Sequence, residues 1–175
     1  MKYLSLILFL FFSQYVYSQK SVYNIQLDSI SGKRKIQFSN FSGKPILVCV
    51  IPTDTTVKST ILQINELKKI VKNDLIFVFI PLKSKKDLHI KKFGDYVKDL
   101  VKFQVHVSEE IDSWDESKQL NKWLSKSSEN GKLNVNNVGP NHKFLINSKG
   151  FLKGTYKPFV TPTHPLLIQA IADSK

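Results

Sequence analysis

Two continuous apolar runs dominate the hydrophobic pattern of this chain. Residues 45–51 (PILVCVI) and 75–82 (LIFVFIPL) contain no charged side chain and are rich in β-branched and aromatic residues. Runs of this length and composition are typical of strands buried on both faces. The segment between them carries apolar residues at helical spacing: Ile61, Leu62, Ile64, Leu67, Ile70 and Val71. The pattern predicts a parallel β–α–β unit whose helix is capped by Thr55 or Thr56.

Alternating patterns on either side of this unit predict two antiparallel hairpins. Residues 22–30 and 35–38 alternate around a Ser-Gly-Lys turn, and residues 142–156 predict two strands around a second turn. Further elements are expected as a strand at 103–107 and as helices at 93–100, 117–126 and 166–172. This order predicts an α/β protein with a thioredoxin-like fold, in which helices flank a central mixed sheet and a β-hairpin lies at the N-terminus.

The first 18 residues have the pattern of a secretory signal peptide. Lys2 precedes a short apolar run, and the small residue Ser18 offers a cleavage site. The run is shorter than the roughly 20 apolar residues that a membrane span needs; an uncleaved anchor helix is the alternative. We expect residues 1–18 to be removed and residues 19–175 to form one domain, exported to the periplasm or secreted, with no stable membrane anchor.

The chain is strongly basic, with a net charge of +12. Arg34 is its only arginine, and the lysines are scattered along the whole sequence. Nucleic-acid-binding surfaces more often gather arginines and aromatic residues on one face. We therefore expect a solvated basic surface and no nucleic-acid partner, with phosphate binding as the alternative.

Cys49 is the only cysteine, so no disulfide can form within the chain. Inside a buried strand it should behave as a small hydrophobic residue.

The spacing of the histidines is not that of metal ligands, and the spacing of the acidic residues between 109 and 116 is not that of a calcium-binding loop. We therefore expect neither a metal nor a cofactor. His142 is expected to be an exposed loop residue. The four histidines are His89, His106, His142 and His164.

Polar residues follow the first apolar run, at positions 53–56 (TDTT). We expect the Asp or Thr side chains to hold the first free amides of the following helix. An acid or binding role for Asp54, or a small anion at the helix N-terminus, is the alternative.

Several stretches together, in order, resemble the glutathione peroxidase family of thiol peroxidases. The resemblance covers nearly all of residues 19–175 and implies a thioredoxin fold. The alternative is the wider group of thioredoxin-like redoxins, which has the same order of elements. The similar stretches are residues 21–51 with their Gly-Lys turn, LIFVFIPL at 75–82, LNKWLSKSSENG at 120–131, and KFLINSKGFLKGTYKPFVTPTHP at 143–165.

The catalytic residues that this resemblance implies are absent. The family's peroxidatic cysteine falls at Thr55, its glutamine at Ser84, its tryptophan at Gly139 and its asparagine at Pro140. A shift of one residue would place Asn141 in the asparagine position. Peroxide reduction needs a thiolate, and a threonine hydroxyl cannot replace it.

We therefore predict an exported, glutathione-peroxidase-like protein that is catalytically degenerate. It would bind an unknown protein or small-molecule ligand in the former active-site cleft around Thr55, Ser84 and Pro140. One alternative is an active thiol-dependent peroxidase or redoxin of the oxidative-stress response, acting through Cys49 or a borrowed thiol. The other is a structural envelope-associated protein without a ligand.

Overall fold

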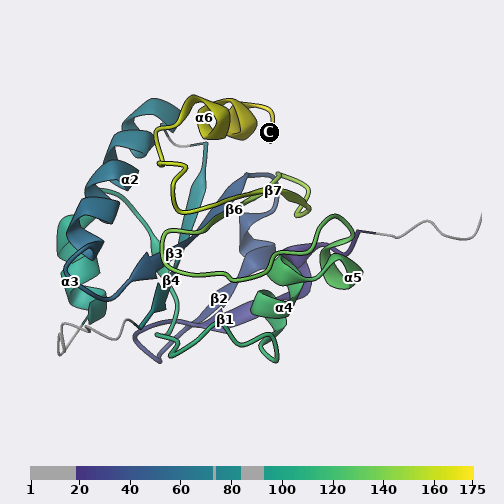
Figure 1. Ribbon diagram of the computed structural model, residues 1–175, viewed down its shortest axis with the longest axis horizontal. Helices are drawn as coiled ribbons and strands as arrows, with labels where there is room; N and C mark the ends of the chain where they lie inside the picture. Colours follow the sequence, from purple (N-terminus) through teal and green to yellow (C-terminus); the bar gives the residue numbers. More distant parts are fainter. Residues whose placement is uncertain (1–18, 73, 84–92) are drawn as a thin grey trace, which may run out of the picture.

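The computed structural model describes residues 19–72, 74–83 and 93–175. Its centre is a five-stranded mixed sheet (Figure 1). The strands are β3 (Ile46–Pro52), β4 (Ile76–Leu82), β5 (His106–Val107), β6 (Lys143–Ile146) and β7 (Leu152–Tyr156). Their order is β5-β4-β3-β6-β7, with β3 parallel to β4 and antiparallel to β6. The predicted central mixed sheet is confirmed.

The central strand β3 is buried along its whole length because both faces of the sheet are covered. Its alternate side chains enter two separate hydrophobic cores. Ile46, Val48 and Val50 face one core, and Leu47, Cys49 and Ile51 face the other. The continuous apolar run at 45–51 therefore reflects burial on two sides, as predicted.

Three helices cover the face of the sheet that carries Cys49 (Figure 1). They are α2 (Val57–Val71), α3 (Phe93–Leu100) and α6 (Pro165–Ala172). α2 joins β3 to β4 and completes the predicted β–α–β unit. One stripe of α2 is buried in the core, through the side chains of Ile61, Ile64 and Leu67.

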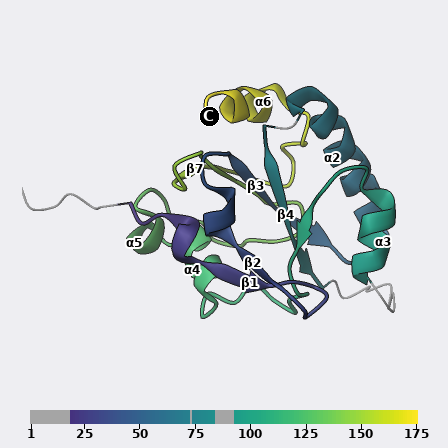
Figure 2. The same ribbon diagram turned by 180° about the vertical axis from the view of Figure 1, so that it is seen from behind.

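The opposite face carries the N-terminal hairpin and the shorter helices, as Figure 2 shows from behind. The elements there are β1 (Gln26–Asp28), β2 (Lys35–Gln37), α4 (Gln119–Ser125), α5 (Ser127–Asn130) and two 3₁₀ helices, η2 (Val22–Asn24) and η3 (Phe38–Phe41). β1 and β2 pair antiparallel as predicted, and Gly32 adopts a φ of 66° in the turn between them.

Several sequence-based expectations need correction. Leu62 and Ile70 were expected in the apolar stripe of α2, but each residue is 50% exposed, because both lie on the side of the helix that is turned away from the buried stripe. The strand predicted at 103–107 is only the two residues of β5, and residues 22–24 form a 3₁₀ helix instead of a strand. The short helix α5, at residues 127–130, was not predicted.

Residues 1–18, the predicted signal peptide, lie outside the described residues, and so do Ser84 and His89. Within the part of the chain that the structure describes, no helix is long and apolar enough to cross a membrane.

Candidate functional site

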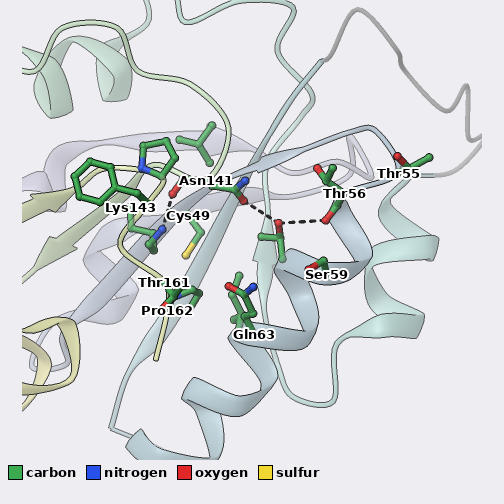
Figure 3. Close-up of a pocket in the computed structure, with 14 residues that line it drawn as sticks. Cys49, Thr55, Thr56, Ser59, Gln63, Asn141, Lys143, Thr161 and Pro162 are labelled. Atoms are coloured by element: carbon green, nitrogen blue, oxygen red, sulfur yellow. Dashed lines mark hydrogen bonds between the residues drawn. The ribbon is translucent and has the colours of Figure 1, made fainter. Parts of the chain in front are cut away.

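A cavity of about 510 Å³ lies on the helical face of the sheet. Its walls come from the middle of β3, the first turns of α2, the start of β6 and the loop that joins β7 to α6 (Figure 3). These segments are far apart in the sequence. Of the four positions that the resemblance marked, Thr55 lines this cavity, while Gly139 and Pro140 are not among its described lining residues and Ser84 is not described.

The turn before α2 is held by the carboxylate of Asp54. Its Oδ1 accepts hydrogen bonds from the backbone nitrogen of Thr56 at 2.9 Å and from the Thr56 hydroxyl at 2.6 Å. Thr56 occupies the N-cap position, but its own side chain makes no capping bond. Asp54 therefore provides the side-chain capping that was expected from Asp or Thr. Thr55 is exposed at the rim of the cavity.

Asn141 connects the start of β6 to both β3 and α2. Its backbone adopts a φ of 66°, and its N–H donates to the carbonyl of Val50 at 2.7 Å. The Thr60 hydroxyl donates to its side-chain Oδ1 at 2.8 Å (Figure 3). Asn141, the shifted candidate for the family's asparagine, thus forms part of the cavity wall, whereas Pro140 is exposed.

Lys143 is a buried cation in the cavity wall, which the sequence analysis did not single out. The residue is only 3% exposed, and its Nζ donates to the backbone carbonyl of Asn141 at 2.5 Å. Burial lowers the pKa of the Lys143 ammonium group, and the neighbouring Cys49 acts in the opposite direction. The one sequence signal for its unusual position was a charged residue at the head of a strand that is otherwise apolar (KFLI).

Cys49 also contributes to the cavity wall, although it is only 2% exposed. Burial raises the pKa of its thiol to about 12, against a smaller opposing effect of the positive charge of Lys143. The expected burial of Cys49 in mid-strand is confirmed. Its position beside the cavity was not foreseen, since a residue in the middle of a strand was expected to be out of reach of any ligand.

His142 was expected to be exposed, and this expectation was wrong. The residue is 4% exposed, its Nδ1 accepts from the backbone nitrogen of Gly139 at 3.5 Å, and its ring stacks on Phe144 with centroids 5.8 Å apart. The side-chain alternation of β6 extends back to His142, which places it on the Phe144 side of the sheet, away from Lys143 and the cavity. Burial lowers its pKa, as do the charges of Lys143 and Lys157.

Among the described residues, no group of three His, Cys, Asp or Glu side chains is placed to hold a metal ion. His106 packs on Phe41 with ring centroids 4.6 Å apart, so it lies against the hydrophobic core on the face of the sheet opposite the cavity. Two residues of the acidic segment form ion pairs instead: Asp112 with Lys83 at 2.7 Å, and Glu116 with Lys126 at 2.6 Å.

Comparison with solved structures identifies the fold of this chain. No protein-family model and no curated protein matches the sequence. Among solved structures, the apo form of Trgpx is similar at 21% identity and a TM-score of 0.61, covering 89% of this chain and 97% of its own. T. cruzi GPX1 is similar at 17% identity and a TM-score of 0.54, with coverages of 88% and 93%.

A thiol:disulfide interchange protein of the thioredoxin family from Chlorobium tepidum TLS is also similar, at 14% identity and a TM-score of 0.59, covering 89% of this chain and 96% of its own. The chain therefore has the predicted thioredoxin-like fold. The two gpx structures agree with the resemblance found in the sequence, and the interchange protein agrees with the wider redoxin group. At these identities the likeness concerns the fold alone.

Proposed function

We propose that this protein is an exported, glutathione-peroxidase-like protein that is catalytically degenerate and binds a ligand in the cavity between β3, α2 and the β7–α6 loop. One observation carries the proposal: the cavity has Thr55 at its rim and the buried thiol of Cys49 in its wall, and neither can supply a thiolate.

The state of Cys49 is the first support. Burial raises the pKa of its thiol to about 12, so the neutral thiol strongly predominates at pH 7. Reaction with a peroxide requires the thiolate as nucleophile and an open path to the sulfur. The hydroxyl of Thr55 is exposed, but it neither ionises near neutral pH nor forms a sulfenic acid.

The shape of the cavity is the second support. Its volume of about 510 Å³ lies in the range of small-molecule sites. Hydroxyl and amide groups line one side, and proline and phenylalanine side chains line the mouth. This combination favours a ligand-binding protein over a structural protein without a ligand.

Export is proposed from residues 1–18, whose charge and hydrophobicity have the pattern of a signal peptide. The single cysteine agrees with this, because a buried lone thiol cannot form unwanted disulfides in an oxidising compartment.

A second candidate function is a redoxin that acts through Cys49. The observation in its favour is that Cys49 faces a cavity and has Lys143 beside it, since a nearby cation favours a thiolate. Burial has the larger effect on Cys49, and its pKa is raised. This candidate therefore requires the cavity to open further around the sulfur.

The experiment is peroxide turnover by the purified protein with hydrogen peroxide or a lipid hydroperoxide, using thioredoxin or glutathione as the reductant. The native protein and Cys49→Ser should both be inactive. Thr55→Cys in the Cys49→Ser background should gain slow turnover, whereas Ser128→Cys, an exposed cysteine on α5, should gain none. Turnover by the native protein that disappears in Cys49→Ser would overturn the proposal in favour of the redoxin.

A further inference from the structure

The ammonium group of Lys143 is enclosed by protein but has no anionic partner among the described residues. None of the ion pairs formed by these residues includes it. Among the described residues its one hydrogen bond runs to the carbonyl of Asn141, and an ammonium group can donate three. Burying a charge without a counter-ion is unfavourable, because the hydration that it loses is not replaced.

The rest of the cavity wall adds no negative charge. None of its described lining residues is Asp or Glu, so Lys143 gives the cavity a net positive charge. Opposite Lys143, the first turns of α2 present the polar side chains of Ser59 and Gln63 toward the cavity (Figure 3). These groups can hydrogen-bond to the remaining polar atoms of an occupant.

The mouth of the cavity is apolar. Phe159 lies in the β7–α6 loop with Pro158 and Pro162 beside the opening, and its side chain is 79% exposed. An aromatic ring presented to solvent at a cavity mouth offers a flat apolar surface to a bound molecule. The site thus combines an enclosed cation with an aromatic rim.

From this arrangement we propose that the cavity binds a small organic anion, whose carboxylate or phosphate group pairs with Lys143 and whose apolar body packs on Phe159. The inference rests on the proposed function, because it names the ligand class of the same cavity. The anion supplies the counter-charge that the described residues do not provide, and hydrogen bonds to a charged donor are stronger than those between neutral groups.

The test is a titration of the ¹⁵N-labelled full-length protein with three probes that share a phenyl ring. Benzoate carries a carboxylate, phenylphosphonate carries a phosphate-like group, and benzamide is neutral. The amide signals of Asn141, Lys143 and Thr60 report occupancy of the cavity. Lys143→Met removes the cation, and Lys149→Met, at an exposed position of the β6–β7 turn, is the matched control.

We expect at least one anion to shift the cavity signals with an affinity about tenfold higher than that of benzamide. Lys143→Met should remove this preference, and Lys149→Met should leave it unchanged. Phe159→Ala, a change at an exposed position that does not disturb the core, should weaken both anions and benzamide about equally. The stronger of the two anions identifies the carboxylate or the phosphate as the preferred group.

Two results would overturn the inference, and they differ in what they say about the proposed function. If benzamide binds as well as the anions, or if Lys143→Met binds the anions as well as the native protein, the cavity is a ligand site but Lys143 does not select anions. If none of the probes shifts a cavity signal, both the anion inference and the ligand-binding part of the proposed function fail.

Discussion

Cys49 and Lys143 are register partners on the antiparallel strands β3 and β6, and both side chains lie on the face of the sheet that carries the cavity. Burial favours the neutral form of each: it raises the pKa of the thiol and lowers that of the ammonium group. Their mutual attraction opposes both shifts but is the smaller effect. The pair is therefore a thiol held in its neutral form beside a lysine whose charged form is disfavoured by burial.

The raised pKa of Cys49 predicts a loss of stability at alkaline pH. The unfolded chain releases the thiol proton near pH 9.0, whereas the folded chain holds it to about pH 12. The stabilisation by the bound proton is thus complete below pH 9.0 and falls by at most about 1.4 kcal/mol per pH unit above it. Urea unfolding across this range should show the native protein losing stability relative to Cys49→Ala. Parallel stability curves for the two proteins would contradict the assignment.

Lys143→Met should stabilise the protein at pH 7, by about 1–3 kcal/mol, because it removes a buried lysine that has no counter-ion among the described residues. Folding lowers the pKa of Lys143 from 10.5. Below the folded pKa the lysine is charged in both the folded and the unfolded chain, so the free-energy cost of burying its charge applies in full. That cost disappears as the pH rises through the folded pKa towards 10.5, and the advantage of Lys143→Met should shrink with it.

The same urea experiment on Lys149→Met, an exposed lysine, should show a change within about 0.5 kcal/mol. A Lys143→Met protein that is less stable than the native one at every pH would mean that the lysine is retained for the structure and not for a ligand.

Asp54→Ala should destabilise the protein by about 0.5–2 kcal/mol, because it frees the backbone nitrogen and the hydroxyl of Thr56 from their shared acceptor. Thr55→Ala, one residue further along and exposed, should change the free energy of unfolding by less than about 0.5 kcal/mol. Thermal unfolding of the two variants checks this, and equal effects would show that the turn is not organised by Asp54.

Gly150→Ala should be much more disruptive than Gly43→Ala. Both glycines have a positive φ, of 83° and 85°, so the backbone strain from an added Cβ is similar. At Gly150 the added Cβ would clash with the Ser21 hydroxyl and lie 2.8 Å from the Tyr23 ring, whereas at Gly43 it meets nothing within 4 Å. We expect a difference of about 1–3 kcal/mol between the two variants in urea unfolding. A difference near zero would mean that residues 21–23 do not pack against this turn.

Sequence periodicity was sufficient for the framework of the fold. The runs at 45–51 and 75–82 are strands because two-sided burial requires continuous apolar sequence, and this requirement is visible without a structure. The N-terminal hairpin and β6–β7 followed from alternation and from turn residues. β5 was overestimated because its length depends on where β4 can pair with it, and a single segment does not reveal that.

The site was less predictable, because it forms between distant segments. Thr55 was found through the resemblance. In the sequence Lys143 resembles the many other lysines of the chain, and its pairing with Cys49 is what places it on the covered face of the sheet. His142 was misjudged because a residue just before a strand can continue the alternation of that strand into the core. The position of Asn141 depends on its left-handed backbone, which the sequence does not specify.

The most direct test of the central claim, that this fold carries no thiol chemistry, is the intact mass of the native protein after exposure to excess hydrogen peroxide, with Cys49→Ser as the reference. A thiol held in its neutral form by burial should gain no oxygen on the timescale of peroxidase reactions, so the two proteins should behave alike. Rapid addition of oxygen to Cys49 in the native protein, absent from Cys49→Ser, would contradict the account and identify the protein as a thiol-dependent redoxin.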